Sequence, residues 1–136
     1  MLTSRVLVVE DDEDSVLLLA ETLVGFGYLA EVAQDGATAL AKASSFQPHV
    51  AVLDIDLPDM DGYQLAAQMR KLSPVTAGMR LVALTGYDGH DELVRAREAG
   101  FDAYLVKPVM PTLLAQAIDG EQAAPGASSR RAFTKL

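Results

Sequence analysis

Cysteine is absent from this chain of 136 residues, which excludes disulfide bonds and thiol chemistry but does not identify a compartment. Long apolar runs are absent too: the longest, SVLLLAETLVGF, is interrupted by Glu21 and is too short to span a bilayer. The first residues, MLTSR, lead into a predicted strand without the pattern of a signal peptide. We therefore expect one soluble, cytoplasmic domain with no membrane insertion.

Positive charge is scarce, with 11 Lys and Arg against 19 Asp and Glu and a net charge of -8. This balance argues against direct nucleic-acid binding, which depends on basic side chains that neutralise phosphates. The acids gather in two runs, EDDED at residues 10–14 and four aspartates within residues 54–61. Both runs follow predicted strands, so we interpret them as parts of a site rather than as a solvated face. The two histidines, His49 and His90, are isolated and indicate no general base.

Short apolar runs alternate with helical patterns, which is typical of repeated βα units around a parallel sheet. The predicted strands cover residues 6–9, 28–33, 49–53, 81–84 and 103–106. Helices are predicted around residues 16–26, 36–46, 63–72, 91–99 and 111–120. Because four strands are almost continuously apolar, helices should cover both faces of the sheet. With right-handed crossovers this predicts an α/β fold: a doubly wound five-stranded parallel sheet of order 2-1-3-4-5, a flavodoxin-like three-layer sandwich.

The periodic pattern ends near residue 120. The remaining residues, EQAAPGASSRRAFTKL, are rich in small side chains and carry a short basic segment. We predict a domain over residues 1–120, followed at 121–136 by a flexible tail or a linker to another part of a longer protein.

Polar side chains stand where four of the predicted strands end: Glu10, Asp11, Asp54, Thr85 and Lys107. In an open parallel sheet, ligands bind outside the carboxyl ends of the strands, at the point where the strand order reverses. That point lies between the first and third strands, which carry the acidic pair and Asp54. We therefore expect these side chains to meet in one pocket.

Carboxylates that meet in this way repel one another, by on the order of 4 kcal/mol per close pair, and need a cation or a proton between them. Oxygen ligands without cysteine or a nearby histidine favour Mg²⁺. An aspartate can also attack phosphorus and form an acyl phosphate. The cation, Lys107 and the Thr85 hydroxyl would each cover one phosphoryl oxygen, so the residues predict a phosphorylatable Asp54 beside Mg²⁺.

Four segments now resemble a known family: VLVVEDDED, PHVAVLDIDLPDMDGYQL, LVALTG and AGFDAYLVKPV. In order and spacing they are similar to the receiver domains of two-component response regulators, over about residues 4–119. The resemblance implies that Asp54 accepts a phosphoryl group from a phosphohistidine of a sensor histidine kinase or a histidine phosphotransfer domain. It also implies a downstream protein effector, and no enzyme activity beyond self-phosphorylation and autodephosphorylation.

The resemblance assigns metal-binding roles by position. Glu10 and Asp11 match the acidic pair that, with Asp54, holds the ion, and Asp56 matches the residue that offers its backbone carbonyl. Glu10 replaces the usual aspartate, which implies a water-mediated contact. Asp12 is an additional acid whose side chain should point elsewhere.

The resemblance also assigns the groups that respond to phosphorylation. Thr85 matches the switch hydroxyl, Tyr104 matches the switch aromatic, and Lys107 precedes a proline as in the family. By the same analogy Asp56 and Tyr87 border the approach of water to the phosphoryl group, and so influence its lifetime.

Three alternatives remain. The run LVALTGY…AREAGFDAYLVKPV looks more like the receivers of hybrid histidine kinases, so the chain could be a segment of such a protein. Asp54-Ile55-Asp56 also matches the DxD of phosphatases with an aspartate nucleophile, although their DxD follows the first strand. A pseudo-receiver that only binds partners should lack Asp54, Lys107 or the acidic pair, and none is missing.

Overall fold

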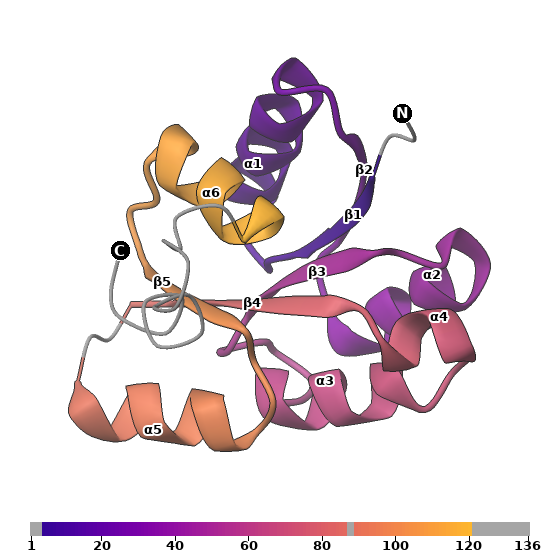
Figure 1. Cartoon of the computed structure of the whole chain (residues 1–136), viewed down its shortest axis with the longest axis vertical. Coiled ribbons are helices and arrows are strands. Elements are labelled where there is room, and N and C mark those ends of the chain that lie inside the picture. Colours follow the sequence, from indigo (N-terminus) through magenta and orange to yellow (C-terminus); the bar gives the residue numbers. More distant parts are fainter. Residues whose placement is uncertain (1–3, 87–88, 121–136) are drawn as a thin grey trace.

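Five parallel strands form the centre of the protein in the order β2-β1-β3-β4-β5, as the sequence predicts (Figure 1). This computed structural model describes residues 4–86 and 89–120. Its strands are β1 (Arg5–Val9), β2 (Leu29–Ala33), β3 (Val50–Asp54), β4 (Arg80–Thr85) and β5 (Ala103–Val106). All four pairings between neighbours are parallel. Most of the strand ends differ from the predicted ends by one residue. Asp54 is the last residue of β3, and Thr85 is the last residue of β4.

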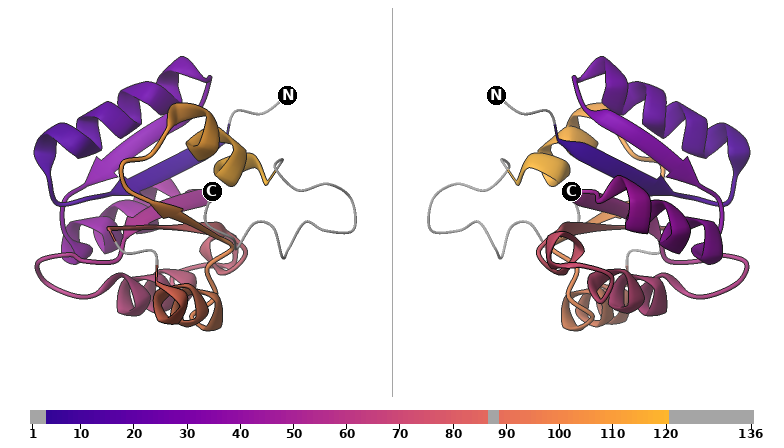
Figure 2. Two further views of the ribbon diagram at one scale, coloured as in Figure 1. Left: turned by 90° about the vertical axis from the view of Figure 1, so that its left-hand side faces the viewer. Right: turned by 90° about the vertical axis from the view of Figure 1, so that its right-hand side faces the viewer.

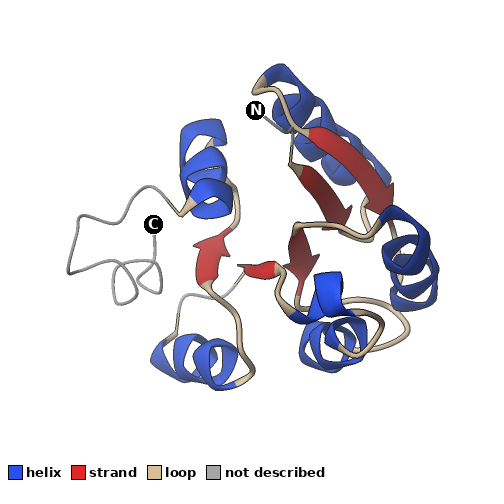
Figure 3. Ribbon diagram, turned by 45° about the vertical axis from the view of Figure 1, so that its right-hand side comes forward, coloured by secondary structure: helices blue, strands red, loops and turns tan. Residues whose placement is uncertain are grey.

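Helices cover both faces of the sheet and complete the predicted three layers. They are α1 (Glu13–Gly25), α2 (Gly36–Phe46), α3 (Gly62–Arg70), α4 (Pro74–Ala77), α5 (His90–Glu98) and α6 (Pro111–Asp119). Helices α1 and α6 lie on one face, and α2, α3 and α5 lie on the other (Figures 1 and 2). Figure 3 shows the strands enclosed between these two helical layers.

Alternate residues of β1, β3, β4 and β5 enter two separate hydrophobic cores. In β1, Leu7 and Val9 pack with α2 and α3, whereas Val6 and Val8 pack with α1 and α6. All four side chains are fully buried. Because both faces of the sheet are covered, the inner strands contain no alternating polar residues, which explains the continuous apolar runs of the sequence.

The short helix α4 was not predicted. It is a single turn that begins at Pro74, with a capping box between Ser73 and Thr76. Four residues are too few to show helical periodicity in a sequence.

Two acids of the runs at residues 10–14 and 54–61 cap the starts of helices. The Asp12 carboxylate accepts a hydrogen bond from the backbone N–H of Ser15 at the start of α1, which confirms that its side chain points elsewhere. Asp61 does the same for Gln64 at the start of α3. Aspartate suits these positions because it satisfies an unpaired N–H and the positive end of the helix dipole.

None of the described helices is long and apolar enough to cross a membrane. Helix α6 ends at Asp119 and is capped by Gly120 in the left-handed conformation. The predicted tail at 121–136 lies outside the described residues.

Candidate functional site

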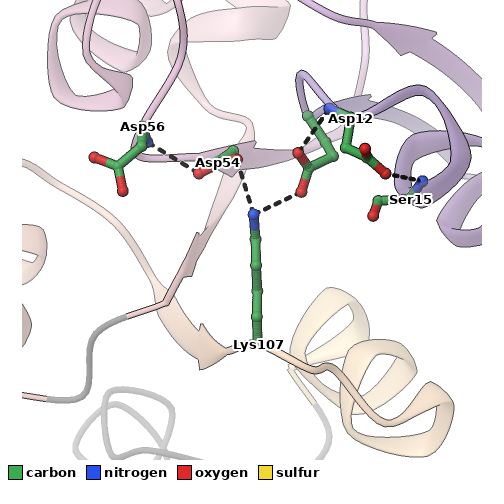
Figure 4. A network of polar contacts seen from close by, with 6 residues as sticks. Asp12, Ser15, Asp54, Asp56 and Lys107 are labelled. Carbon is green, nitrogen blue, oxygen red and sulfur yellow. Dashed lines mark hydrogen bonds and ion pairs between the residues drawn. The ribbon is translucent and has the colours of Figure 1, made fainter.

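The carboxyl edge of the sheet brings three of the predicted residues into direct contact. The Lys107 Nζ atom lies 2.6 Å from Glu10 Oε1 and 2.9 Å from Asp54 Oδ2. Glu10 directly follows β1, Asp54 ends β3, and Lys107 follows β5, so one amine links groups from three strands (Figure 4). Strands β1 and β3 are neighbours at the point where the strand order reverses, where such folds bind ligands.

Both buried carboxylates are held in the same way. Glu10 and Asp54 are each 3% exposed. The second oxygen of Glu10 accepts the backbone N–H of Asp12 at 3.0 Å, and the second oxygen of Asp54 accepts that of Asp56 at 2.9 Å (Figure 4). Each carboxylate therefore has one oxygen on Lys107 and the other on the main chain two residues ahead, which fixes its orientation.

Asp11 completes an acidic cluster with these two residues. Glu10, Asp11 and Asp54 each offer a carboxylate oxygen, and these oxygens lie within 4.8 Å of one another. The pKa of Asp11 is raised above its ordinary value by a hydrogen bond with the Glu10 carboxylate, then by partial burial and by the charge of Glu10. Three carboxylates against one ammonium leave an excess of negative charge, and oxygen donors of this kind suit a hard divalent cation such as Mg²⁺.

Lys107 stays protonated in this environment. Burial alone would lower the pKa of its amine, but the hydrogen bonds to Glu10 and Asp54 and the charges of these acids outweigh that effect and raise it. The ammonium therefore serves as a permanent positive charge at the edge of the cluster.

The loop of residues 55–61, between β3 and α3, passes directly beside Asp54. Gly62 donates its backbone N–H to the carbonyl of Ile55 at 2.8 Å, and a Cβ atom at Gly62 would lie 2.8 Å from the Asp54 carbonyl oxygen. Only glycine allows so close an approach. The loop and one acid of the cluster line a hollow formed by Asp11, Ile55, Asp56, Leu57, Pro58, Asp59, Met60 and Asp61.

The two predicted switch residues are both buried. Thr85 ends β4 with no exposed surface, and its carbonyl accepts the backbone N–H of Lys107 at 2.8 Å. Tyr104, in β5, is 1% exposed and belongs to the core beneath α2, α3 and α5. The Tyr104 ring therefore already points inward in this structure. Tyr87, predicted to influence lifetime, lies outside the described residues.

One acid of the second run has a position that the sequence did not indicate. Asp59 caps the start of α2, where its carboxylate accepts the backbone N–H groups of Gly36 at 2.8 Å and Ala37 at 3.0 Å. The partners lie more than 20 residues away along the chain, so no local pattern could predict the contact.

Comparison with known proteins now gives the family. The family model described as "Response regulator receiver domain" matches residues 6–119. This chain belongs to that family. The receiver domain is 34% identical over 113 residues to the response regulator PleD of Caulobacter vibrioides, which covers 83% of this chain and 25% of PleD. It is 36% identical over 110 residues to the alkaline phosphatase synthesis transcriptional regulatory protein PhoP of Bacillus subtilis, covering 81% of this chain and 45% of PhoP.

Solved structures agree with the assignment. The receiver domain matches a CheY-like response regulator receiver domain protein from Methanospirillum hungatei with a TM-score of 0.78 and 36% identity, over 87% of this chain and 92% of that one. It matches the chemotaxis protein CheY4 of Vibrio cholerae with a TM-score of 0.81 and 28% identity, over 87% and 98% of the two chains. The family and the fold inferred from the sequence are thereby confirmed.

Proposed function

We propose that this receiver domain accepts a phosphoryl group on Asp54 from a phosphohistidine, in a reaction that depends on Mg²⁺. The observation that carries the proposal is the contact of Lys107 with both Asp54 and Glu10, at 2.9 and 2.6 Å. The proposal is supported because this positive charge lies beside a buried carboxylate that also belongs to the acidic cluster of Glu10, Asp11 and Asp54. Phosphoryl transfer needs mainly this kind of positioning and charge neutralisation.

The transfer itself forms one bond and breaks one. A carboxylate oxygen of Asp54 attacks the phosphorus atom, and the bond from phosphorus to the imidazole nitrogen of the donor breaks with its electron pair left on that nitrogen. Lys107 would exchange a carboxylate oxygen for a phosphoryl oxygen, and the Thr85 hydroxyl would donate to another. Glu10, Asp11, Asp54 and the backbone carbonyl of Asp56 would hold Mg²⁺, with a water between the ion and Glu10. When bound, the ion neutralises charge on the phosphoryl oxygens.

Thr85 and Tyr104 would then convert phosphorylation into a change of surface. The phosphoryl group can shift the conformational equilibrium only by its different affinity for the two states. Because the Tyr104 ring is already buried, the proposed switch requires an unphosphorylated population in which this ring points outward. Tyr87 and Asp56 remain our proposed determinants of how fast water removes the phosphoryl group.

A direct test is to incubate the protein with acetyl phosphate and Mg²⁺ and to map the modified residue by mass spectrometry. We expect one phosphorylated residue, Asp54, and none in Asp54→Asn. Asp35→Asn is the matched control, because the Asp35 carboxylate caps α2 through the backbone N–H of Thr38. Phosphate incorporated in Asp54→Asn at the level of the wild type would refute the proposal.

The partners follow from the same proposal. The chain spans about a quarter of PleD and less than half of PhoP, so the output of a complete protein is not fixed by these relatives. We propose a sensor histidine kinase or a histidine phosphotransfer domain as donor, a protein effector downstream, and a cytoplasmic location. The net charge of -8 argues against direct nucleic-acid contact by this chain. The alternative is a receiver segment of a hybrid histidine kinase, and family membership argues against an aspartate phosphatase.

A further inference from the structure

The loop of residues 55–61 is fixed at its base and again at its tip. At the base, the backbones of Asp56 and Asp61 form an isolated antiparallel β-bridge, and the Gly62 N–H donates to the Ile55 carbonyl. At the tip, the Asp59 carboxylate accepts both the Gly36 and the Ala37 N–H groups at the start of α2. The tip is thus attached to a helix that belongs to a different βα unit.

A packing contact reinforces the tip. A Cβ atom at Gly36 would lie 2.6 to 2.8 Å from three atoms of the Met60 side chain. Gly36 is buried, and Met60 packs against the core beneath α2 and α3. Because any larger residue at position 36 would push Met60 away, the tip fits closely onto α2.

The same loop orients the phosphoacceptor. The backbone N–H of Asp56 holds one oxygen of Asp54 at 2.9 Å, and the loop borders the acidic cluster beside Asp11. A displacement of the loop would therefore move both the Asp54 carboxylate and the main chain near Asp56.

The N-cap residue of α2 is already a carboxylate: Asp35 accepts the N–H of Thr38 at 2.7 Å. Asp59 takes two further N–H groups of the same first turn, those of Gly36 and Ala37. The second carboxylate comes from the loop, and its two charge-assisted hydrogen bonds to backbone N–H groups are stronger than neutral ones. Their evident consequence is to attach the loop to α2.

We propose that Asp59 is a positioning residue for the phosphorylation site: it docks the loop of residues 55–61 onto α2 and thereby orients Asp54 and Asp56 for metal binding and phosphoryl transfer. The inference rests on the proposed function. Groups that orient metal ligands from outside typically change metal affinity or activity by about 10- to 100-fold when they are removed.

The test compares two alanine variants that each remove one carboxylate from the start of α2. Asp59→Ala removes the two hydrogen bonds that hold the loop tip on α2, whereas Asp35→Ala leaves them in place. We measure the melting temperature without metal, the dissociation constant of Mg²⁺ from backbone NMR shifts, and the rate of phosphorylation by acetyl phosphate. Both variants should melt at lower temperature. Only Asp59→Ala should weaken Mg²⁺ binding and slow phosphorylation, each by about 10-fold.

Asp59→Asn supplies a partial rescue, because its single amide oxygen can accept from one of the two N–H groups, whereas Asp59 uses a separate oxygen for each. We expect the Mg²⁺ affinity of this variant to lie between those of Asp59→Ala and the wild type. Equal Mg²⁺ affinities and equal rates in the two alanine variants would overturn the inference and leave the proposed function intact. A wild-type protein that neither binds Mg²⁺ nor takes up phosphate would overturn both.

Discussion

The two edges of the sheet both hold charged side chains, but they use them in opposite ways. At the amino edge, Arg5 donates from Nε to the Phe46 carbonyl at 2.8 Å and from Nη2 to the Gln47 carbonyl at 2.7 Å, where α2 ends. Arg80 donates from Nε to the Ala117 carbonyl at 2.6 Å, near the end of α6. At the carboxyl edge, by contrast, acids face other acids, and one ammonium lies between two of them.

The difference separates stability from function. Arginines at the carboxyl ends of helices donate to unpaired carbonyls and interact favourably with the negative end of the helix dipole, so these charges stabilise the fold. The acidic cluster retains an excess of negative charge that a cation or a phosphoryl group with its cation can balance. Substitutions at the amino edge should therefore reduce stability and spare phosphorylation, whereas substitutions at the carboxyl edge should affect phosphorylation first.

Lys107→Met should have the largest effect, because Lys107 balances two buried acids and its loss should therefore affect stability as well as phosphorylation. It leaves the buried Glu10 and Asp54 without their cation. Because the Lys107 side chain is 35% exposed, the cost should approach but not exceed the roughly 3 kcal/mol that breaking a fully buried pair costs at least. We expect this loss of unfolding free energy at pH 8 without metal, together with no measurable phosphorylation. Urea denaturation at pH 8 checks the loss, with the exposed Lys71→Met as control. Equal stability of the two variants at pH 8 would contradict the expected role of the lysine.

Arg80→Met should have the next largest effect, and on stability alone. It keeps the apolar stem but removes the bond to the Ala117 carbonyl, which costs about 1 to 2 kcal/mol. The cost stays moderate because Arg80 Nη2 is buried without a hydrogen-bond partner in the part of the chain that the structure describes. We expect unchanged phosphorylation by acetyl phosphate at 25 °C. A slower rate in a fully folded variant would remove the distinction between the edges.

Local patterns account for what the sequence could predict. Val6 to Val9 followed by Glu10, or Val50 to Leu53 followed by Asp54, is a signal contained in a few neighbouring residues. The strand order follows from such runs and from the handedness of crossovers. The close meeting of Glu10, Asp54 and Lys107 then follows from topology alone, because parallel strands end at one edge.

Contacts between distant residues account for what could not be predicted. Arg5 meets its carbonyls 41 and 42 residues away, and Asp59 meets Gly36 across 23 residues. Nothing near these residues in the sequence distinguishes them from ordinary surface charges. For the same reason Asp59 was assigned to the acidic site by its neighbours, although it binds a helix end.

Asp11→Asn should have a smaller effect than Arg80→Met. Without metal it should raise the free energy of unfolding, whereas Arg80→Met lowers it. Asp11 is exposed, so the gain in unfolding free energy without metal should remain below about 1 kcal/mol. Mg²⁺ should stabilise the wild type by RT ln(1 + [L]/Kd) and stabilise this variant less, because a ligand is lost. Melting temperatures over a Mg²⁺ series check both statements. Equal shifts in the two proteins would exclude Asp11 as a ligand.

The smallest expected effects concern pH, where Asp11 and Asp59 should differ in sign. The pKa of Asp59 is lowered by the N–H groups of Gly36 and Ala37, so its carboxylate stabilises the fold above its ordinary pKa of 3.8, and this contribution is lost as pH falls through the lowered value. The pKa of Asp11 is raised by Glu10, so stability falls as pH rises from 3.8 through the raised value.

Without metal at pH 7, Asp59→Asn should therefore be less stable than the wild type, and Asp11→Asn more stable. The Asp11→Asn difference should shrink as the pH falls to 3.8, and the Asp59→Asn difference should shrink only as the pH falls from 3.8 through the lowered pKa of Asp59. Urea denaturation at pH 7 and pH 3 measures all four differences. A stabilised Asp59→Asn at pH 7 would mean that this carboxylate repels the acidic cluster more than it binds α2. In that case Asp59 would belong with the unbalanced charges of the site and not with the charges that hold the fold.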